Sequence, residues 1–461
     1  MSVAMRERIL SELGAIDAGD ARLQDRAQKI GERLLEKPGS GFPQAMSNSA
    51  ELEGLYRFIN NDALDLQTVL APHRASTHAL ASSGTTLVIH DTTACYFSED
   101  VYGMGYIGTH SGFLVHTALA VSNSERHAPL GLMGMMPLVR PKKQLSKKKR
   151  TLKGTLESRR WAALIDRVEE DAHPSAQLIH VLDREGDFYS LLEHLKAHRR
   201  RFVVRAGFDR RVVGEDGEQL GTIWSQVDSF KTVAHRDVEV CARDNTTNAR
   251  KRRVHPSRAR RTAKLTIRSG TLRLRRPVTA TCPQHIADTI EVAFVHAVED
   301  NPPGNEVPIE WLLMTSEPIR TAKQALRVID HYRGRWRVEE FFKALKTGCA
   351  FEQRQSESLE ALLVVLGLLA PIAWQMLALR SLTHDEPNTP ADAVLRATQI
   401  ESLIHLKRLK PNATAKDALW AIASLGGHIK NNGPPGWLTL GRGFEDLEMF
   451  EAGWIAGRAG M

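Results

Sequence analysis

Apolar residues recur at helical spacing through residues 1–75. Four of them lie three or four positions apart and would share one helix face: Leu23, Ala27, Ile30 and Leu34. The segment 38–49 breaks this pattern with glycine, proline and serine. Asn48 or Ser49 can then cap a second helix, because a short polar side chain accepts a hydrogen bond from the first turn. The spacing therefore predicts at least two helices in this region.

The polar faces of these helices carry several arginines. Two short helices with exposed arginines suit a small DNA-binding module, and Arg26 and Arg57 are its candidate DNA contacts. A helical cap on the next domain is the alternative interpretation.

Two short apolar runs predict buried strands that each end at an aspartate. Residues 87–89 (Leu-Val-Ile) precede Asp91, and the run 178–182 precedes Asp183. In α/β sheets, active sites lie at the carboxyl ends of the core strands, so an acidic residue at such an end is a candidate catalytic residue. We therefore expect both aspartates at the functional edge of one sheet.

Further strand-like segments complete the predicted sheet. The runs 113–122 and 128–139 follow the first strand closely, which predicts an antiparallel meander. The stretch 199–207 returns as another strand. Alternating residues from 208 to about 310 predict a β-rich insertion, and 310–319 re-enters the main domain as a strand.

The apolar stretch 361–379 is long enough to span a bilayer. It contains Pro371 and Gln375, follows a charged helix directly and has no companion span. We therefore predict a buried core helix, with a membrane span as the alternative, and further helices in the remaining chain.

The distribution of charged residues along the chain is more informative about a binding partner than the net charge. The 461 residues predict several domains, and Lys plus Arg (62) exceeds Asp plus Glu (54) by only 8. The excess is concentrated at 142–153 and again at 250–261, on a predicted hairpin loop. Such clusters favour a polyanion partner, although a solvated loop is the alternative.

The four cysteines are far apart in the sequence and fit neither a disulfide framework nor a zinc knuckle. The N-terminal residues 1–14 are amphipathic and lack the apolar core of a signal peptide. We therefore expect a cytoplasmic protein.

The stretch 331–346 reads as one helix with two different edges. At about 100° per residue, the polar residues lie within about 60° of Tyr332. These polar residues are Arg335, Glu339, Lys343 and Lys346. A lone carboxylate among cations is often only a solvated salt-bridge face. Glu340 points away from this edge and is the poorer candidate for a functional acid.

Three acids could nevertheless act together. If Asp91 and Asp183 lie on neighbouring strands and the helix of Glu339 packs over their ends, three carboxylates converge. Such a cluster requires cations, and oxygen ligands of this kind favour Mg²⁺ or Mn²⁺. Two such ions would promote phosphodiester displacement.

At this point the chain resembles a known family. Four residues match the Tyr-x2-Arg-x3-Glu-x6-Lys signature of insertion-sequence-four family DDE transposases, in the Tn-five branch: Tyr332, Arg335, Glu339 and Lys346. Similar segments occur at 91–93 (DTT), 181–187 (VLDREGD), 202–205 (FVVR), 311–319 (WLLMTSEPI) and 324–330 (QALRVID). The resemblance covers nearly the full chain.

The resemblance implies an α/β fold with a ribonuclease-H-like catalytic core interrupted by a β-rich insertion. Asp91, Asp183 and Glu339 would be the catalytic triad, holding two Mg²⁺ ions per active site, for which Mn²⁺ can substitute. The expected DNA contacts are Tyr332, Arg335, Lys343, Lys346, Trp311, Arg205, Arg210, Arg26 and Arg57. The implied domains are DNA-binding (1–75), first core part (76–207), insertion (208–308), second core part (309–358) and C-terminal dimerisation region (359–461).

The implied activity is cut-and-paste transposition. The family nicks transposon ends, forms and resolves a DNA hairpin, and joins 3′-OH ends to target DNA. It does so in a homodimeric synapse on inverted repeats. Trp311 occupies the position of a tryptophan that stabilises a flipped base, with a core strand residue as the alternative. A metal-dependent nuclease without strand transfer, or a catalytically silent DNA-binding protein, are the alternative functions. The basic run 142–153 departs from the family pattern.

Overall fold

The computed structural model describes residues 3–98, 101–141, 158–240, 242, 257–278, 285–304, 306–429 and 433–459. The basic run 142–153 and the basic residues at 250–253 lie outside these residues. The chain forms two compact units. The first unit comprises Met1–Gln144, Leu164–Gln177 and Trp336–Met461, and the second comprises Leu145–Ala163 and Leu178–Arg335. Helix α7 (Arg159–Glu170) contains one of the boundaries. The five predicted domain limits do not coincide with this division and stay a prediction.

The first unit begins with helices, as the helical spacing predicts. These are α1 (Val3–Gly14), α2 (Ala21–Glu36), α3 (Phe42–Ala45), α4 (Ser49–Ile59) and α5 (Leu66–Leu80). The buried face of α2 includes Ala27, Ile30 and Leu34. The predicted cap is confirmed at Asn48, whose Oδ1 accepts a hydrogen bond from Glu51 N at 2.9 Å.

The strands of the first unit form the predicted meander. They are β1 (Thr85–Tyr96), β2 (Tyr106–Ile107), β3 (His110–Ser122) and β4 (Pro129–Leu138). Strand β3 pairs antiparallel with both β1 and β4. The prediction that the first strand ends near Asp91 is wrong, because β1 continues to Tyr96. The threonines at 92 and 93 extend the strand, and their register with β3 stays regular.

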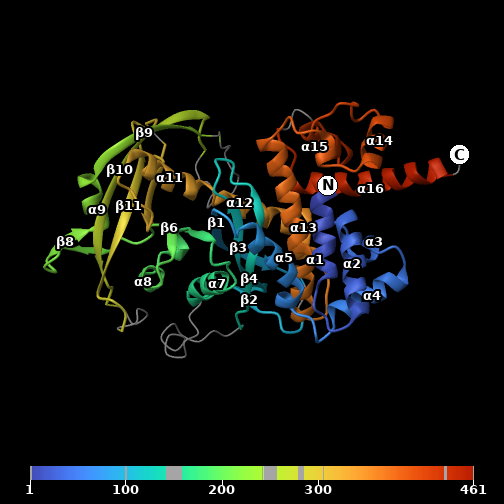
Figure 1. Ribbon diagram of the computed structural model, residues 1–461, viewed down its shortest axis with the longest axis horizontal. Coiled ribbons are helices and arrows are strands. Elements are labelled where there is room, and N and C mark those ends of the chain that lie inside the picture. Colours follow the sequence, from blue (N-terminus) through green and yellow to red (C-terminus); the bar gives the residue numbers. More distant parts are fainter. Residues whose placement is uncertain are drawn as a thin grey trace. The chain divides into compact units, whose positions relative to one another are not determined.

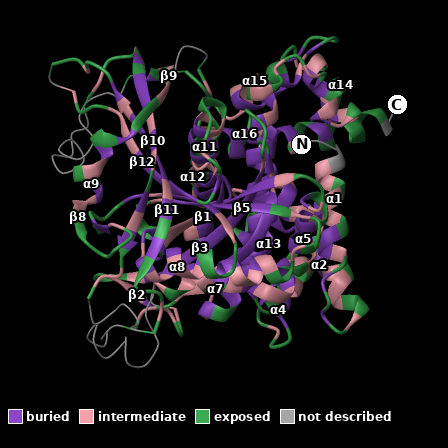
Figure 2. Ribbon diagram, turned by 60° about the vertical axis from the view of Figure 1, so that its left-hand side comes forward, coloured by how far each residue is buried: buried purple, intermediate pink, exposed green. Residues whose placement is uncertain are grey.

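The remaining helices of the first unit include a strongly apolar one, α13. They are α12 (Trp336–Lys343), α13 (Leu359–Asp385), α14 (Ala397–His405), α15 (Ala415–Leu425) and α16 (Trp437–Ala459). Short turns accompany them: a π-helical turn η3 (Ala344–Gly348), η4 (Phe351–Gln353) and η5 (Ala391–Ala393). Helix α13 contacts α1 and α5 (Figure 1), and it is buried along most of its length (Figure 2).

Helix α13 is the predicted core helix. Within the described part of the chain, it is the helix whose length and composition would allow a membrane span, but 94% of its most apolar window is buried inside the protein. Gln375 is also fully buried. The prediction of a buried core helix is therefore confirmed.

The second unit is built on one mixed sheet. Its strands are β5 (Gln177–Leu182), β6 (Arg201–Arg205), β7 (Arg211–Val213), β8 (Gln219–Thr222), β9 (Lys231–Val240), β10 (Arg261–Arg275), β11 (Thr289–Glu299) and β12 (Glu310–Thr315). Their order is β5-β6-β12-β11-β10-β7-β8, with β9 paired to β10. Strands β5 and β6 are parallel, and β12 runs antiparallel to both β6 and β11.

Helical segments accompany this sheet. They are η1 (Arg184–Gly186), α8 (Tyr189–Ala197), α9 (Ile223–Gln226), η2 (Val227–Ser229) and α11 (Ala322–Arg333). Helix α11 contacts β6 and β9 to β12, while α8 contacts β6. The stretch 208–310 is β-rich, as its alternating pattern predicts.

The prediction of a single helix over 331–346 is wrong. Helix α11 ends at Arg333 and α12 begins at Trp336. Gly334 caps α11, and Arg335 N donates to Tyr332 O at 3.1 Å, closing a four-residue turn. Glycine is a poor helix former, so the chain leaves the α-helix at this point. Helical angles counted across Gly334 therefore do not apply.

Candidate active site

Asp91 lies within β1, opposite Thr117 of β3. The strand is buried from Thr86 to His90 and becomes partly exposed at Asp91. One carboxylate oxygen, Oδ1, accepts a hydrogen bond from Thr92 N at 2.7 Å. Asp91 is thus the first residue after the buried half of the strand that is partly exposed to solvent.

Glu339 lies on α12, which contacts β1. The apolar side of this helix is buried through Val338, Phe341 and Phe342, as its sequence predicts. The carboxylates of Asp91 and Glu339 are therefore carried by two elements that pack together in the first unit.

Lys346 follows within the π-helical turn and also reaches β1. Its Nζ donates to Ala94 O and lies 3.4 Å from Glu352 Oε1. The side chain is 22% exposed. This contact makes Lys346 a link between η3 and β1 in addition to its predicted contact with DNA.

Lys343 lies on the polar side of α12. Its Nζ lies 2.6 Å from Glu340 Oε1, and its side chain is 58% exposed. The surface position is compatible with the predicted DNA contact.

Asp183 lies in the second unit, directly after β5. Its carboxylate caps η1 by accepting a hydrogen bond from Glu185 N at 2.8 Å. The predicted position at the end of a buried strand is confirmed.

Two arginines stand near Asp183, one of which the sequence did not single out. Burial lowers the pKa of Arg184, and the charge of Arg205 lowers it further. Arg205 donates through Nη2 to Glu310 O at 3.0 Å. Adjacent cations of this kind attract a phosphate, so Arg184 joins the candidate DNA contacts. Its position beside Asp183 in the charged turn is the signal that could have identified it.

Tyr332 of the signature lies beside Trp311 in the second unit. The rings of Trp311 on β12 and Tyr332 on α11 are 5.3 Å apart and nearly perpendicular. The guanidinium carbon of Arg335 lies 5.9 Å from the Tyr332 ring. Tyr332 is 3% exposed, so its predicted direct contact with DNA does not fit this burial, whereas Trp311 is partly exposed. A partly exposed indole is compatible with stacking on a base.

Arg210 does not fit its predicted role as a DNA contact. It is 8% exposed, and its Nη1 lies 2.5 Å from Oδ1 of the fully buried Asp187. Its Nη2 donates to Asp187 O at 2.7 Å. The guanidinium is committed to neutralising a buried carboxylate, so we assign Arg210 a structural role. Nothing in the sequence around Arg210 indicates that this basic residue is buried.

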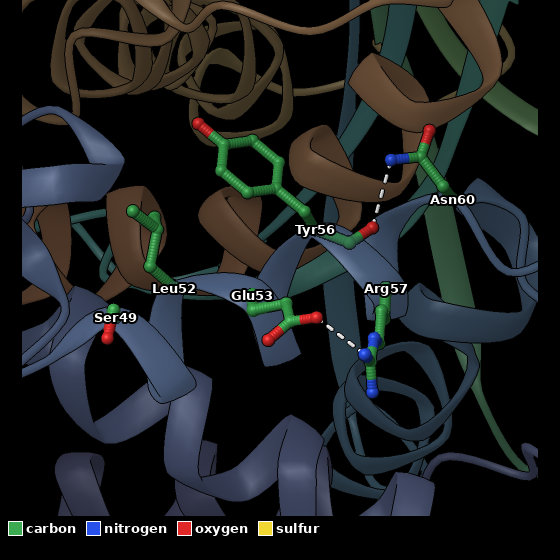
Figure 3. A pocket seen from close by; sticks show the side chains of 6 residues that line it. All are labelled: Ser49, Leu52, Glu53, Tyr56, Arg57 and Asn60. Atoms are coloured by element: carbon green, nitrogen blue, oxygen red, sulfur yellow. Dashed lines mark hydrogen bonds and ion pairs between the residues drawn. The ribbon is translucent and has the colours of Figure 1, made fainter.

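The N-terminal helices present both predicted arginines. Arg57 on α4 pairs with Glu53 at 2.5 Å, and both side chains are largely exposed (70% and 64%). An open pocket of about 470 Å³ lies along this helix (Figure 3). It is lined by Ser49, Leu52, Glu53, Tyr56, Arg57 and Asn60. Arg26 lines a neighbouring groove of about 410 Å³, together with Arg22 and Lys29 of the same helix.

The carboxylates offer hard oxygen ligands, but they are spread over both units. Among the described residues, no group of three His, Cys, Asp or Glu side chains gathers into a metal site. The donor chemistry of Asp91, Asp183 and Glu339 fits a divalent cation, and the meeting of all three remains a prediction.

Two family models match the chain. The Transposase DDE domain matches residues 137–373, which is slightly more than half of the protein. The chain belongs to the DDE transposase family. A second model, Transposase DNA-binding, matches residues 5–64, which include Arg26 and Arg57. The first match includes Asp183 and Glu339, whereas Asp91 precedes it.

This membership establishes the general activity. The protein is a DNA transposase, an enzyme that cleaves DNA and transfers strands, and DNA is its partner. Its family uses divalent metal ions and has a ribonuclease-H-like fold. The N-terminal helices α2 and α4 lie within the matched DNA-binding region.

Proposed function

We propose that this DDE transposase performs cut-and-paste transposition and belongs to the Tn-five branch of the insertion-sequence-four family. Asp91, Asp183 and Glu339 form its catalytic triad. The observation that carries this proposal is the packing of α12, which bears Glu339, against β1, which bears Asp91. The signature residues Tyr332 and Lys346 support the branch assignment.

The triad would hold two Mg²⁺ ions, with Mn²⁺ as a substitute. The three carboxylates would supply oxygen ligands for these ions. When bound, such ions activate an attacking oxygen and stabilise a leaving oxygen in phosphodiester displacement. Three like-charged carboxylates held close together repel one another, which explains why the triad requires cations.

Residues of the chain itself hold the DNA. Arg184 and Arg205 bind a phosphate beside Asp183, because charge-assisted hydrogen bonds to phosphate are strong. Trp311, supported at its edge by Tyr332, stacks on a flipped base during hairpin formation. The core is interrupted by the β-rich segment 208–308.

The active species would be a homodimer on two transposon ends, working in the cytoplasm on the nucleoid. Helix α16 would support pairing, because it exposes several apolar side chains along its length. These are Leu438, Met449, Phe450 and Ile455.

The test uses DNA that carries the inverted repeats flanking the gene, incubated with the protein and Mg²⁺. Excision of the flanked element through a hairpin and its joining to target DNA would support the proposal. Cleavage without joining would identify a nuclease, and a mobility shift without cleavage would identify a catalytically silent DNA-binding protein.

A further inference from the structure

Arg354 is a buried cation that fastens the loop after α2 to the chain that follows the π-helical turn. The residue is 4% exposed. Its Nη2 donates to Pro38 O at 2.5 Å and to Cys349 O at 2.8 Å, and its Nη1 donates to Ser40 O. The guanidinium carbon lies 5.2 Å from the ring of Phe42. One side chain therefore joins two segments about 300 residues apart in the sequence.

Stability alone is a weak reason for this arrangement. Burial lowers the pKa of Arg354 to about 10, so the guanidinium is still charged at neutral pH. A well-packed apolar side chain of similar size often stabilises a protein as much as a buried charge, or more. The planar guanidinium does, however, fix the directions of several acceptors at once, which an apolar residue cannot do.

The loop held by Arg354 also touches the π-helical turn directly. A Cβ atom on Gly39 would lie 3.3 Å from Gly348 O and 3.2 Å from Glu445 Oε1. The Gly39 N–H donates to that same Glu445 oxygen at 3.1 Å. Helix α12 continues directly into η3, which ends at Gly348. A displacement of the loop would therefore be passed to the helix that carries Glu339.

We propose that Arg354 is a positioning residue that couples DNA binding by the N-terminal region to DNA cleavage. The loop at 38–41 belongs to the matched DNA-binding region, residues 5–64. DNA bound by α2 and α4 would hold this loop in place. The loop in turn holds the end of the segment formed by α12 and η3, through Arg354 and through its contact with Gly348. The inference rests on the proposed role of Glu339 in cleavage.

The experiment measures end binding and single-turnover cleavage separately, on a duplex carrying the flanking inverted repeat with Mg²⁺. Arg354→Lys keeps the charge but loses the planar fork. We expect its cleavage rate constant to fall at least about tenfold, since a misplacement of about 1 Å can cost about a hundredfold. The affinity for the duplex and the fraction of active enzyme should stay near wild type. Guanidinium ion below denaturing concentrations should restore cleavage by Arg354→Ala.

Gly39→Ala tests the same contact from the other side and leaves Arg354 in place. It should also slow cleavage at unchanged affinity, whereas Gly14→Ala, where a Cβ meets only ordinary contacts, should not. If both Arg354→Lys and Gly39→Ala cleave bound DNA at the wild-type rate constant, the coupling role is wrong. Failure of the proposed function would differ, because wild-type protein would then also leave the duplex uncut.

Discussion

The indole Nε1 of Trp437 donates a hydrogen bond to Oε2 of Glu340 at 3.2 Å, tying the first residue of α16 to the middle of α12. Lys343 Nζ and Arg380 Nη1 lie 2.6 and 3.3 Å from the same carboxylate. Burial by itself raises the pKa of Glu340, but these partners lower it overall. Glu340 is therefore occupied in joining helices, which leaves its neighbour Glu339 as the functional acid of α12.

Replacement of the two neighbouring glutamates should separate their roles. We expect Glu339→Ala to lower cleavage about a thousandfold or more, equivalent to about 4 kcal/mol of transition-state stabilisation, with end binding retained. Glu340→Ala should keep cleavage measurable but lower the thermal unfolding temperature. Cleavage assays and gel shifts on the same DNA would check both. An equal loss of DNA binding in Glu339→Ala would contradict its assignment as a metal ligand.

Trp311→Ala should slow hairpin formation and preserve nicking of the first strand. The loss of one stacking contact of about 1–3 kcal/mol corresponds to about 5- to 150-fold in rate. Denaturing gels that resolve nicked and hairpin products would measure both steps. Trp224→Ala, which removes another partly exposed tryptophan of the second unit, serves as the control. Unchanged hairpin kinetics would leave Trp311 as a core residue of β12.

Arg210→Ala should destabilise the protein, because it leaves the fully buried Asp187 without its cation. Burial raises the pKa of Asp187, and the charge of Arg210 opposes that rise. Removing one partner of such a buried pair costs about 3–5 kcal/mol. Arg57→Ala, in an exposed pair with Glu53, should change stability by less than about 1 kcal/mol but weaken DNA binding. Denaturant unfolding and gel shifts would show the opposite pattern if Arg210 contacted DNA.

Stability should fall as the pH is lowered from about 7 towards 5, because of His73. Its Nε2 accepts from Leu132 N at 3.1 Å, so Nδ1 carries the proton and donates to Glu12 at 2.7 Å. Burial lowers the pKa of His73 below its ordinary value of 6.5. The unfolded chain therefore binds a proton near pH 6.5 that the folded chain does not, and this favours unfolding at lower pH. A protonated ring would also set an Nε2–H against the Leu132 N–H.

His73→Gln should accordingly be less stable at pH 7 and show a shallower dependence on pH. Thermal unfolding at several pH values would measure this slope. The exposed His198 provides a matched His→Gln control that should keep the wild-type slope. If His73→Gln had the same slope as wild type, the imidazole would not be the group that titrates.

Shortening the basic run 142–153 should lower non-specific DNA affinity. Each phosphate contact that is lost should reduce the slope of log K against log salt concentration by about 0.9 on duplex DNA. Filter binding at several salt concentrations would measure this. If neither affinity nor slope changes, the run is only a solvated loop.

The sequence predicted those helices, caps and strands that are determined by interactions between neighbouring residues. The apolar spacing of α2, the cap at Asn48 and the buried strand before Asp183 all follow from neighbouring residues. The buried helix α13 also follows from its composition together with Pro371 and Gln375. The apolar run before Asp91 does not predict the continuation of β1, because the residues after Asp91 stay in the strand through their pairing with β3.

Contacts made across long sequence distances gave no signal. Arg210 and Arg354 look like ordinary surface cations in the sequence, and only the fold shows that both are buried. Their partners are carbonyl oxygens and one carboxylate that no spacing rule connects to them. The family signature identified residues that share a function, but it carried no information on how the chain supports them.

The turn at Gly334 has a practical consequence for protein engineering. One boundary between the compact units falls between Arg335 and Trp336. Tyr332 and Arg335 therefore belong to one unit, and Glu339 and Lys346 belong to the other. No truncation or domain exchange along this boundary can transplant the signature whole. A chimera built from two such transposases would combine half a signature from each parent, and would report whether the two halves are interchangeable.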